Sequence, residues 1–127
     1  MQNVNFFSLI ILLSCHSADD AKSVISASEA AKKIGEKVTV EMEVKSVGRG
    51  KSGVYFLNSE ENYRSNENFT LFIDRAGAAK FKKAGIPDPA EHFKGKKVRA
   101  TGTVKLYKER PEIVVEDPMQ IELVEKK

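Results

Sequence analysis

The chain has 127 residues, enough for one hydrophobic core but not for two. Hydrophobic residues make up 41% of the chain and charged residues 31%, which is ordinary for a soluble globular protein. A net charge of +3 is too small to indicate a nucleic-acid-binding protein by itself. The charge is unevenly distributed, however: residues 48–127 hold 16 Lys and Arg against 12 Asp and Glu, whereas residues 1–47 hold 5 against 6.

The first eighteen residues have the pattern of an export signal. The apolar run Phe6–Leu13 is as long as the core of a signal peptide and too short to span a bilayer, although no Lys or Arg precedes it. Cys15 follows a Leu-Leu-Ser triplet, which resembles a bacterial lipobox in which Cys15 would carry lipid. The alternative is an ordinary signal peptide, cleaved near residue 17 or 18, with Cys15 discarded. Both predict an exported protein, periplasmic or anchored to the membrane as a lipoprotein.

No disulfide is expected, because the chain has a single cysteine. The predicted organisation is a signal peptide at 1–18, a polar linker at 19–25 and one domain at 26–127. Ser26 and Glu29 have the spacing of a capping box, which predicts a short helix over 27–33 that ends before Gly35.

The first half of the domain continues with strands. Val38, Val40, Met42 and Val44 alternate with polar residues, which predicts a strand over 38–47 with one buried face and a bulge near 46–47. After this strand the pattern predicts a glycine-rich loop at 48–53, a strand at 54–58 and a polar loop at 59–68.

The second half shows the same alternation. Phe69, Leu71 and Ile73 are expected to face the core from a third strand. The pattern then predicts a helix at 76–84 ended by Gly85 and a proline-rich loop, a fourth strand at 98–107, a hairpin turn at 108–110, a fifth strand at 112–116 and a last extended piece at 121–124.

The fourth strand gives the clearest pattern. Its inward positions are expected to be Val98, Ala100, Gly102, Val104 and Leu106, alternating with polar or charged residues. Because a glycine on the inward side lets a strand bend sharply, Gly102 favours the corner of a small barrel.

The order strand, strand, strand, helix, strand, strand is that of an OB-fold. Four segments, at 37–40, 56–58, 93–104 and 107–115, resemble bacterial OB-fold proteins of the tRNA-anticodon-binding type. The resemblance covers roughly residues 26–124, and the segments at 93–104 and 107–115 are its specific part. It implies an all-β fold with small α content: a five-stranded Greek-key OB barrel, a helix between strands three and four, and a short N-terminal helix. It also implies nucleic-acid binding.

A candidate binding site follows from this fold. OB-folds bind across strands two and three, between the loops that join strands one to two and four to five. Aromatic rings would stack on bases while Lys and Arg neutralise phosphates. The candidate residues in this chain are Arg49, Lys51, Tyr55, Phe56, Thr70, Phe72, Lys105, Tyr107, Lys108 and Arg110.

These residues also have an interpretation without a ligand. Phe56 and Leu57 cannot both point inward from a regular strand, and packing in the core or at the rim is the favoured position for Phe56. Phe72 is expected on the outer face, because its neighbours claim the core. The charged loop residues would then only keep the surface soluble. The Gly48-x-Gly50-x-x-Gly53 pattern is not a dinucleotide site, since no helix follows it.

Little in the sequence indicates catalysis. Neither histidine is well placed, there is no Cys and His set for a metal, and Glu41 and Glu43 are expected to belong to a charged strand face. The sequence therefore predicts a non-catalytic module without metal or cofactor that binds single-stranded DNA, RNA or another polyanion. The alternative is an exported envelope protein whose barrel binds a protein, a glycan or a small ligand.

Overall fold

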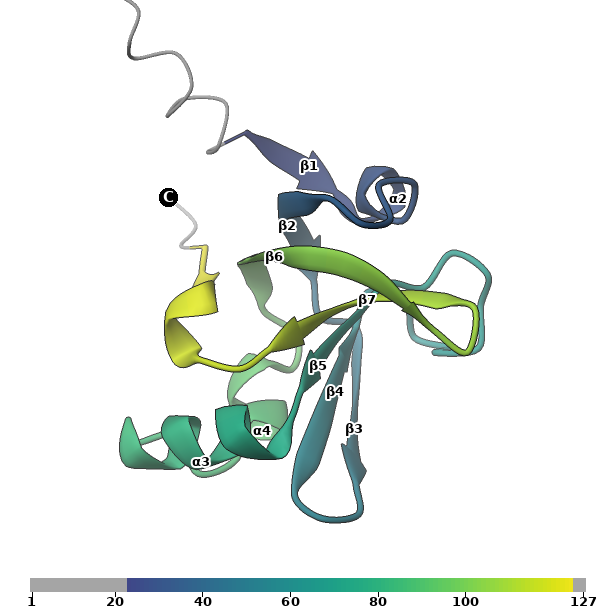
Figure 1. Cartoon of the computed structure of the whole chain (residues 1–127). Coiled ribbons are helices and arrows are strands. Elements are labelled where there is room, and N and C mark those ends of the chain that lie inside the picture. Colours follow the sequence, from purple (N-terminus) through teal and green to yellow (C-terminus); the bar gives the residue numbers. More distant parts are fainter. Residues whose placement is uncertain (1–22, 125–127) are drawn as a thin grey trace, which may run out of the picture.

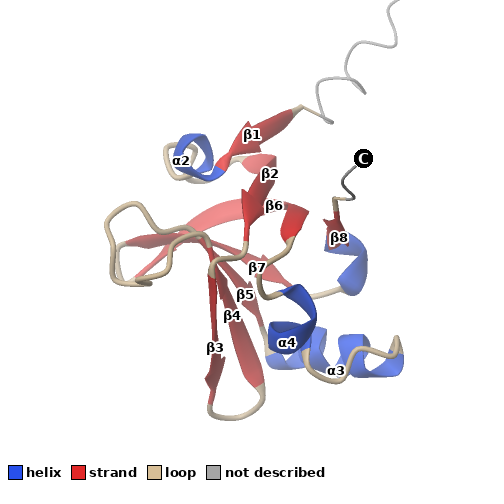
Figure 2. Cartoon of the chain, turned by 180° about the vertical axis from the view of Figure 1, so that it is seen from behind, coloured by secondary structure: helices blue, strands red, loops and turns tan. Residues whose placement is uncertain are grey.

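The computed structural model describes residues 23–124, so Cys15 and the predicted signal peptide lie outside the described residues. The fold is mostly β, with few and short helices (Figures 1 and 2). The strands are β1 Val24–Ser26, β2 Lys37–Glu43, β3 Ser46–Gly50, β4 Val54–Asn58, β5 Thr70–Ile73, β6 Lys97–Tyr107, β7 Arg110–Val115 and β8 Ile121–Leu123. The helices are α2 Ala27–Ala30, α3 Arg75–Lys83, α4 Pro89–Phe93 and the 3-10 turn η2 Pro118–Gln120. None of these helices has the length and apolar character that crossing a membrane requires.

The eight described strands form one sheet in the order β1-β2-β6-β7-β5-β4-β3, and β8 pairs with β6. β1 with β2 and β5 with β7 are parallel pairs, whereas the other pairs are antiparallel. Strands β2 and β3 stand far apart in this order, yet only Val44 and Lys45 separate them in the chain. The strands curve strongly, and α3 and α4 lie together beside them (Figures 1 and 2).

The strand predicted over 38–47 is divided into β2 and β3. The chain changes partner at Val44 and Lys45: β2 pairs with β6, whereas β3 pairs with β4. Both residues remain hydrogen-bonded, since Val44 N donates to the Lys96 carbonyl at 2.8 Å and Lys45 N donates to the Asn58 carbonyl at 2.9 Å. This division, together with the unpredicted β1 and the short β8, raises the number of strands above the five expected.

Two local predictions had different outcomes. The capping box is confirmed: Glu29 N donates to Ser26 Oγ and Ser26 N donates to Glu29 Oε1, each at 3.2 Å, although α2 is shorter than predicted. The proline-rich loop after α3 instead contains α4. Pro89 occupies its first turn, where the missing N–H removes no helical hydrogen bond, and the Asp88 side chain caps Glu91 N at 3.2 Å.

The core lies between the inner faces of the strands and the helices, and it contains the residues expected there from their alternation. Phe69, Leu71 and Ile73 are fully buried, as predicted. Leu106 is the exception, because it is 52% exposed. It pairs with Pro111 near the tip of the β6–β7 hairpin, beyond the last buried residue of β6, Val104. The alternation therefore gave the correct face for Leu106 but not its distance from the core.

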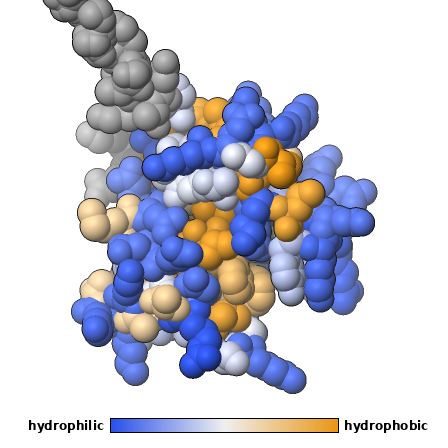
Figure 3. Space-filling model, viewed as in Figure 1, coloured by the Kyte–Doolittle hydropathy of each residue, from blue (hydrophilic) through white to orange (hydrophobic). Residues whose placement is uncertain are grey.

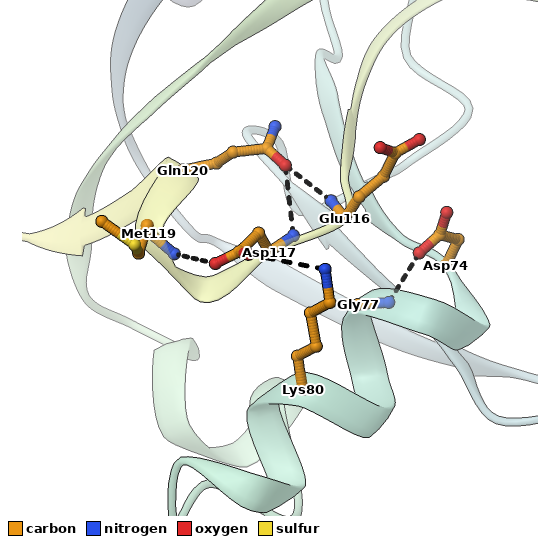
Figure 4. A network of polar contacts seen from close by, with 7 residues as sticks. All are labelled: Asp74, Gly77, Lys80, Glu116, Asp117, Met119 and Gln120. Atoms are coloured by element: carbon orange, nitrogen blue, oxygen red, sulfur yellow. Dashed lines mark hydrogen bonds and ion pairs between the residues drawn. The ribbon is translucent and has the colours of Figure 1, made fainter.

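Strands β6 and β7 diverge where Gln120 lies between them. Its side-chain nitrogen donates to the Thr101 carbonyl on β6 at 3.1 Å and to the Val114 carbonyl on β7 at 3.0 Å. Its side-chain oxygen accepts from Glu116 N at 2.7 Å and from Asp117 N at 3.1 Å (Figure 4). The amide thus satisfies backbone groups that have lost their ladder partners.

Helix α3 packs closely beside this turn. A Cβ at Gly77 would lie 2.3 Å from the Val115 carbonyl oxygen, so only glycine lets the helix approach β7 this closely. Lys80 of α3 also reaches Asp117, with 3.5 Å between Nζ and Oδ2 (Figure 4). We call Lys80, Asp117 and Gln120 the η2 joint; it joins α3, β6 and β7.

Candidate binding face on the outer surface of the strands

A row of apolar residues crosses the outer face of β3, β4, β5 and β7. In the strand register, Gly48 is opposite Phe56, Phe56 is opposite Phe72, and Phe72 is opposite Val114. The rings of Phe56 and Phe72 are 5.2 Å apart between centroids and tilted by 41°. Both side chains remain partly exposed. We call Gly48, Phe56, Phe72 and Val114 the aromatic row.

The glycines of β3 make room for the Phe56 ring. A Cβ at Gly50 would lie 3.1 Å from Phe56 Cε2 and 2.6 Å from Val54 Cγ2, and a Cβ at Gly48 would lie 3.5 Å from Phe56 Cδ2. The ring therefore covers the backbone of β3. The interpretation of Gly48 and Gly50 as part of a loop was wrong, because the turn is confined to residues 51–53. A side chain at Gly50 would crowd Val54 and the Phe56 ring, whereas a Cβ at Gly48 would make an ordinary contact with the ring.

A row of polar residues runs beside the aromatic row. Its members, in the order of the strands, are Ser46, Asn58, Thr70, Glu112 and Lys105, which we call the polar row. Asn58 Nδ2 donates to Ser46 Oγ at 3.3 Å, and Thr70 Oγ1 donates to Asn58 Oδ1 at 2.9 Å. Asn68, from the loop before β5, donates from Nδ2 to Thr70 Oγ1 at 3.0 Å. These bonds hold one end of the binding face in a fixed arrangement.

Glu112 differs from the other members of the polar row. It is only 8% exposed, and within residues 23–124 its carboxyl group has neither a hydrogen bond nor an ion pair. Burial raises the pKa of Glu112, while the positive charge of Lys105 opposes that shift. A buried carboxyl group whose oxygens accept no hydrogen bond from the described residues thus lies on the same face as the phenylalanine rings. It is two residues along β7 from Val114, which is opposite Phe72.

The β6–β7 hairpin forms a cationic edge to the face. Its two turn residues, Lys108 and Glu109, have φ angles of 51° and 67°, the backbone of a type I′ turn. The Lys108 ammonium lies 5.4 Å from the centre of the Tyr107 ring. Arg110 donates to the Tyr63 carbonyl at 3.0 Å, which links the hairpin to the loop at 59–69. Between that loop and the hairpin lies a hollow of about 180 Å³.

The structure brings most of the predicted site residues together. Phe56, Thr70, Phe72 and Lys105 share the outer face, and the hairpin residues Tyr107, Lys108 and Arg110 lie at its edge. Phe72 faces outward as predicted. Phe56 does not pack in the core: Leu57 takes the inward position and is fully buried, so the Phe56 ring faces outward and packs against Phe72.

Two predicted residues lie on the other side of the strands. Tyr55 packs against the core, because it shares the inward phase of Leu57. Arg49 is opposite Tyr55 in the register and forms an ion pair with Asp88, 2.6 Å between Nη2 and Oδ2. This hydrogen bond lowers the pKa of Asp88. Lys51 is exposed in the β3–β4 turn, away from the polar row.

The sequence did not indicate Glu112, Asn58, Asn68 or Ser46 as site residues. The polarity of Asn68 predicts only a loop, and Glu112 is one polar position among several in an alternating strand. One feature of the sequence could have indicated Glu112. It lies two residues from Arg110 in the same strand, so both side chains are expected on the same face. Its proximity to Thr70 depends on a parallel pairing over 42 residues of chain, which local sequence does not determine.

The charged outer face of β2 and β6 has an internal role. Arg99 Nε donates to Glu41 Oε1 at 2.8 Å, and Lys97 Nζ lies 3.8 Å from Glu41 Oε2. The hydrogen bond from Arg99 lowers the pKa of Glu41. Across residues 23–124, no group of three or more His, Cys, Asp or Glu side chains is arranged to hold a metal ion.

No protein-family model and no curated protein sequence matches the chain. Solved structures with a similar fold exist. An OBody bound to hen egg-white lysozyme has a TM-score of 0.57 and 19% identity over 83% of this chain and 96% of the other. A putative aspartyl-tRNA synthetase from Leishmania major has a TM-score of 0.52 and 14% identity over 83% of this chain. Asparaginyl-tRNA synthetase from Pyrococcus horikoshii has a TM-score of 0.52 and 18% identity over 81% of this chain.

The similar region is 21% of the Leishmania synthetase and 23% of the Pyrococcus synthetase, so the chain spans less than a quarter of either enzyme. At these identities the likeness shows the fold alone. The chain has a fold of the OB type, as the resemblance in its sequence implied.

Proposed function

We propose that this chain is a non-catalytic OB-type binding module that holds a single strand of nucleic acid across the aromatic row. In this proposal β2 and β3 are the two halves of the first strand of a five-stranded barrel, whose other strands are β4, β5, β6 and β7. The observation that carries the proposal is the paired rings of Phe56 and Phe72, which face outward beside a cationic hairpin.

Stacking and charge explain how this face would bind. A base that stacks on an aromatic side chain gains about 1–3 kcal/mol, whatever its identity. Lys105 in the polar row and Lys108 and Arg110 in the hairpin beyond it can neutralise phosphates. Apolar surface gathers over the middle of the strands and hydrophilic surface around it (Figure 3), which suits bases in the centre and the backbone at the margin. The synthetases with a similar fold are, by name, enzymes that act on tRNA.

Fluorescence anisotropy tests this proposal. Labelled single-stranded DNA and RNA oligomers are titrated with the full chain over a series of salt concentrations. We expect micromolar or tighter affinity that falls steeply with salt. The double variant Lys108→Ala, Arg110→Ala should bind more weakly and with a flatter salt dependence, by about 0.7 in slope for each lost phosphate contact. Unchanged binding by this variant would show that the hairpin is not part of the site.

A second candidate function is binding of a protein or a glycan by the same face. The supporting observation is the OBody structure, in which a similar fold is bound to lysozyme. In either case the predicted signal peptide would place the chain outside the cytoplasm, with Cys15 as the candidate lipid attachment site. Absence of oligonucleotide binding at low salt, together with retention on cell-wall material, would favour this second candidate.

A further inference from the structure

The outer face of β2 and β6 changes in charge along its length. At one end Glu41 pairs with both Arg99 and Lys97, so the positive charges there are compensated. At the other end Lys37 is opposite Thr103 in the register, and Lys105 follows two residues later on β6. Within the described part of the chain neither lysine has an ion pair. The second end therefore has two lysines without an ion pair, although Glu112 is opposite Lys105 and Glu116 lies nearby.

A hollow of about 560 Å³ lies at this positive end, between β6, β7 and η2. Two lysines, Lys37 and Lys105, line it, together with hydroxyl groups, one glutamate and the apolar side chains of Val114 and Met119. Val114 also belongs to the aromatic row and Lys105 to the polar row. The hollow is thus continuous with the proposed binding face.

Met119 lies at the margin of the hollow, on the η2 turn. Its side chain is 93% exposed, the most exposed large apolar side chain of the described residues. Its backbone N–H donates to Asp117 Oδ1 at 2.9 Å, within the joint made by Lys80, Asp117 and Gln120. Figure 4 shows the Met119 side chain pointing away from this network. An exposed thioether on a turn whose backbone is hydrogen-bonded offers a contact surface for a flat aromatic group.

We propose that the nucleic-acid strand continues from the aromatic row, over Val114, into this hollow, where Lys37 and Lys105 contact phosphates and Met119 packs against a base. Lys37 and Lys105 are diagonal neighbours, with Cα atoms about 7–8 Å apart. Their flexible side chains can therefore reach successive phosphates of one strand. This inference rests on the proposed function, and it lengthens the site beyond the outer face of β4 and β5.

Oligonucleotides of two lengths test the aromatic row and the hollow separately. Oligothymidylates of 4 and 12 nucleotides are compared by anisotropy with the full chain, because the short one can cover only the aromatic row. Lys37→Ala should weaken binding of the 12-mer about fivefold at 0.1 M salt and reduce the salt slope by about 0.7. Met119→Ala should weaken binding of the 12-mer without changing the salt slope. Neither variant should change the affinity for the 4-mer.

Lys97→Ala is the matched control, because Lys97 lies on the same face of β6 at the end neutralised by Glu41. It should bind the 12-mer within twofold of the wild type. Equal affinity of the wild type for both lengths, with no effect of Lys37→Ala or Met119→Ala, would overturn the extended site and leave the aromatic row in place. Absence of binding at either length would instead refute the proposed function itself.

Discussion

The aromatic row and the η2 joint lie on neighbouring parts of the surface but use their side chains differently. At the joint, the Gln120 amide makes four hydrogen bonds within the chain, and Asp117 interacts with both Met119 N and Lys80. At the aromatic row, Phe56 and Phe72 leave ring surface exposed, and the nearby Glu112 has no partner among the described residues. We conclude that the joint maintains the fold, whereas the row is available to a ligand.

The largest effect on stability is expected at the joint. Gln120→Ala should lower the free energy of unfolding by about 2 kcal/mol, because two carbonyls and two N–H groups lose their partner. That loss corresponds to a decrease in Tm of about 10 °C by differential scanning calorimetry. Met119→Ala, one residue earlier and exposed, should leave the Tm unchanged. A similar decrease for both variants would contradict the role given to the Gln120 amide.

The aromatic row should show the opposite behaviour, with an effect on binding rather than on stability. Replacing Phe56 and Phe72 by Leu keeps apolar surface but removes the rings, so affinity for oligothymidylate should fall about 10- to 100-fold. The control is Tyr55→Leu on the inward side of β4, which should lower the Tm and leave affinity unchanged. If Tyr55→Leu reduced affinity as much as the double variant, the assignment of faces would be incorrect.

The environment of Glu112 predicts that the free energy of unfolding depends on pH. Its raised pKa means that the folded state holds the proton more tightly, so between 4.5 and the folded pKa the free energy of unfolding decreases as pH rises. Glu112→Gln should therefore raise the free energy of unfolding by about 1 kcal/mol at pH 7 and change it little at pH 4. Urea unfolding at both pH values measures this, with Glu43→Gln as the exposed control. Destabilisation by Glu112→Gln at pH 7 would indicate that the carboxylate is stabilised in the fold.

The stability of the β6–β7 hairpin should depend on the residue types at its two turn positions. Lys108 and Glu109 adopt positive φ angles that Asn and Gly accept more readily. The double variant Lys108→Asn, Glu109→Gly should therefore raise the free energy of unfolding by about 1 kcal/mol, measured by urea unfolding. Lys94→Asn, at a residue with φ of −58°, should have no such effect. No gain from the double variant would mean that the turn is unstrained.

The smallest effect is expected at Arg49. Its ion pair with Asp88 is solvent-exposed, so Arg49→Ala should leave the Tm within experimental error of the wild type. Because Arg49 lies on the side opposite the aromatic row, oligonucleotide affinity should also remain unchanged, whereas Lys105→Ala should weaken it. Equal weakening by both variants would extend the site to the α4 side of the strands.

Much of the fold could be predicted from local pattern. Alternation with a period of two assigned Phe69, Leu71 and Ile73 to the core, and the capping box located the start of α2. The alternation changes phase between Val44 and Val47, which predicted a bulge near 46–47, but local sequence could not show that β2 and β3 pair with different strands there. Helix α4 was missed because Pro89 was interpreted as a breaker, although proline suits the first turn of a helix.

The candidate site was less predictable than the fold. Residue type indicated the rings and cations, but their common face depends on the register of four strands. Gly48 and Gly50 illustrate the difficulty, since glycine indicates a turn in isolation and accommodates the Phe56 ring in the structure.

Amide chemical-shift mapping tests the central claim most directly. A ¹⁵N-labelled sample of the full chain is titrated with an unlabelled oligothymidylate at low salt, and the shifted amides are placed on the structure. We predict shifts along β4, β5 and β7 around Phe56, Phe72 and Val114, and no shifts around Glu41 at the ion-paired end of β2. Absence of shifts at saturating oligonucleotide, or shifts confined to the Glu41 end, would contradict it.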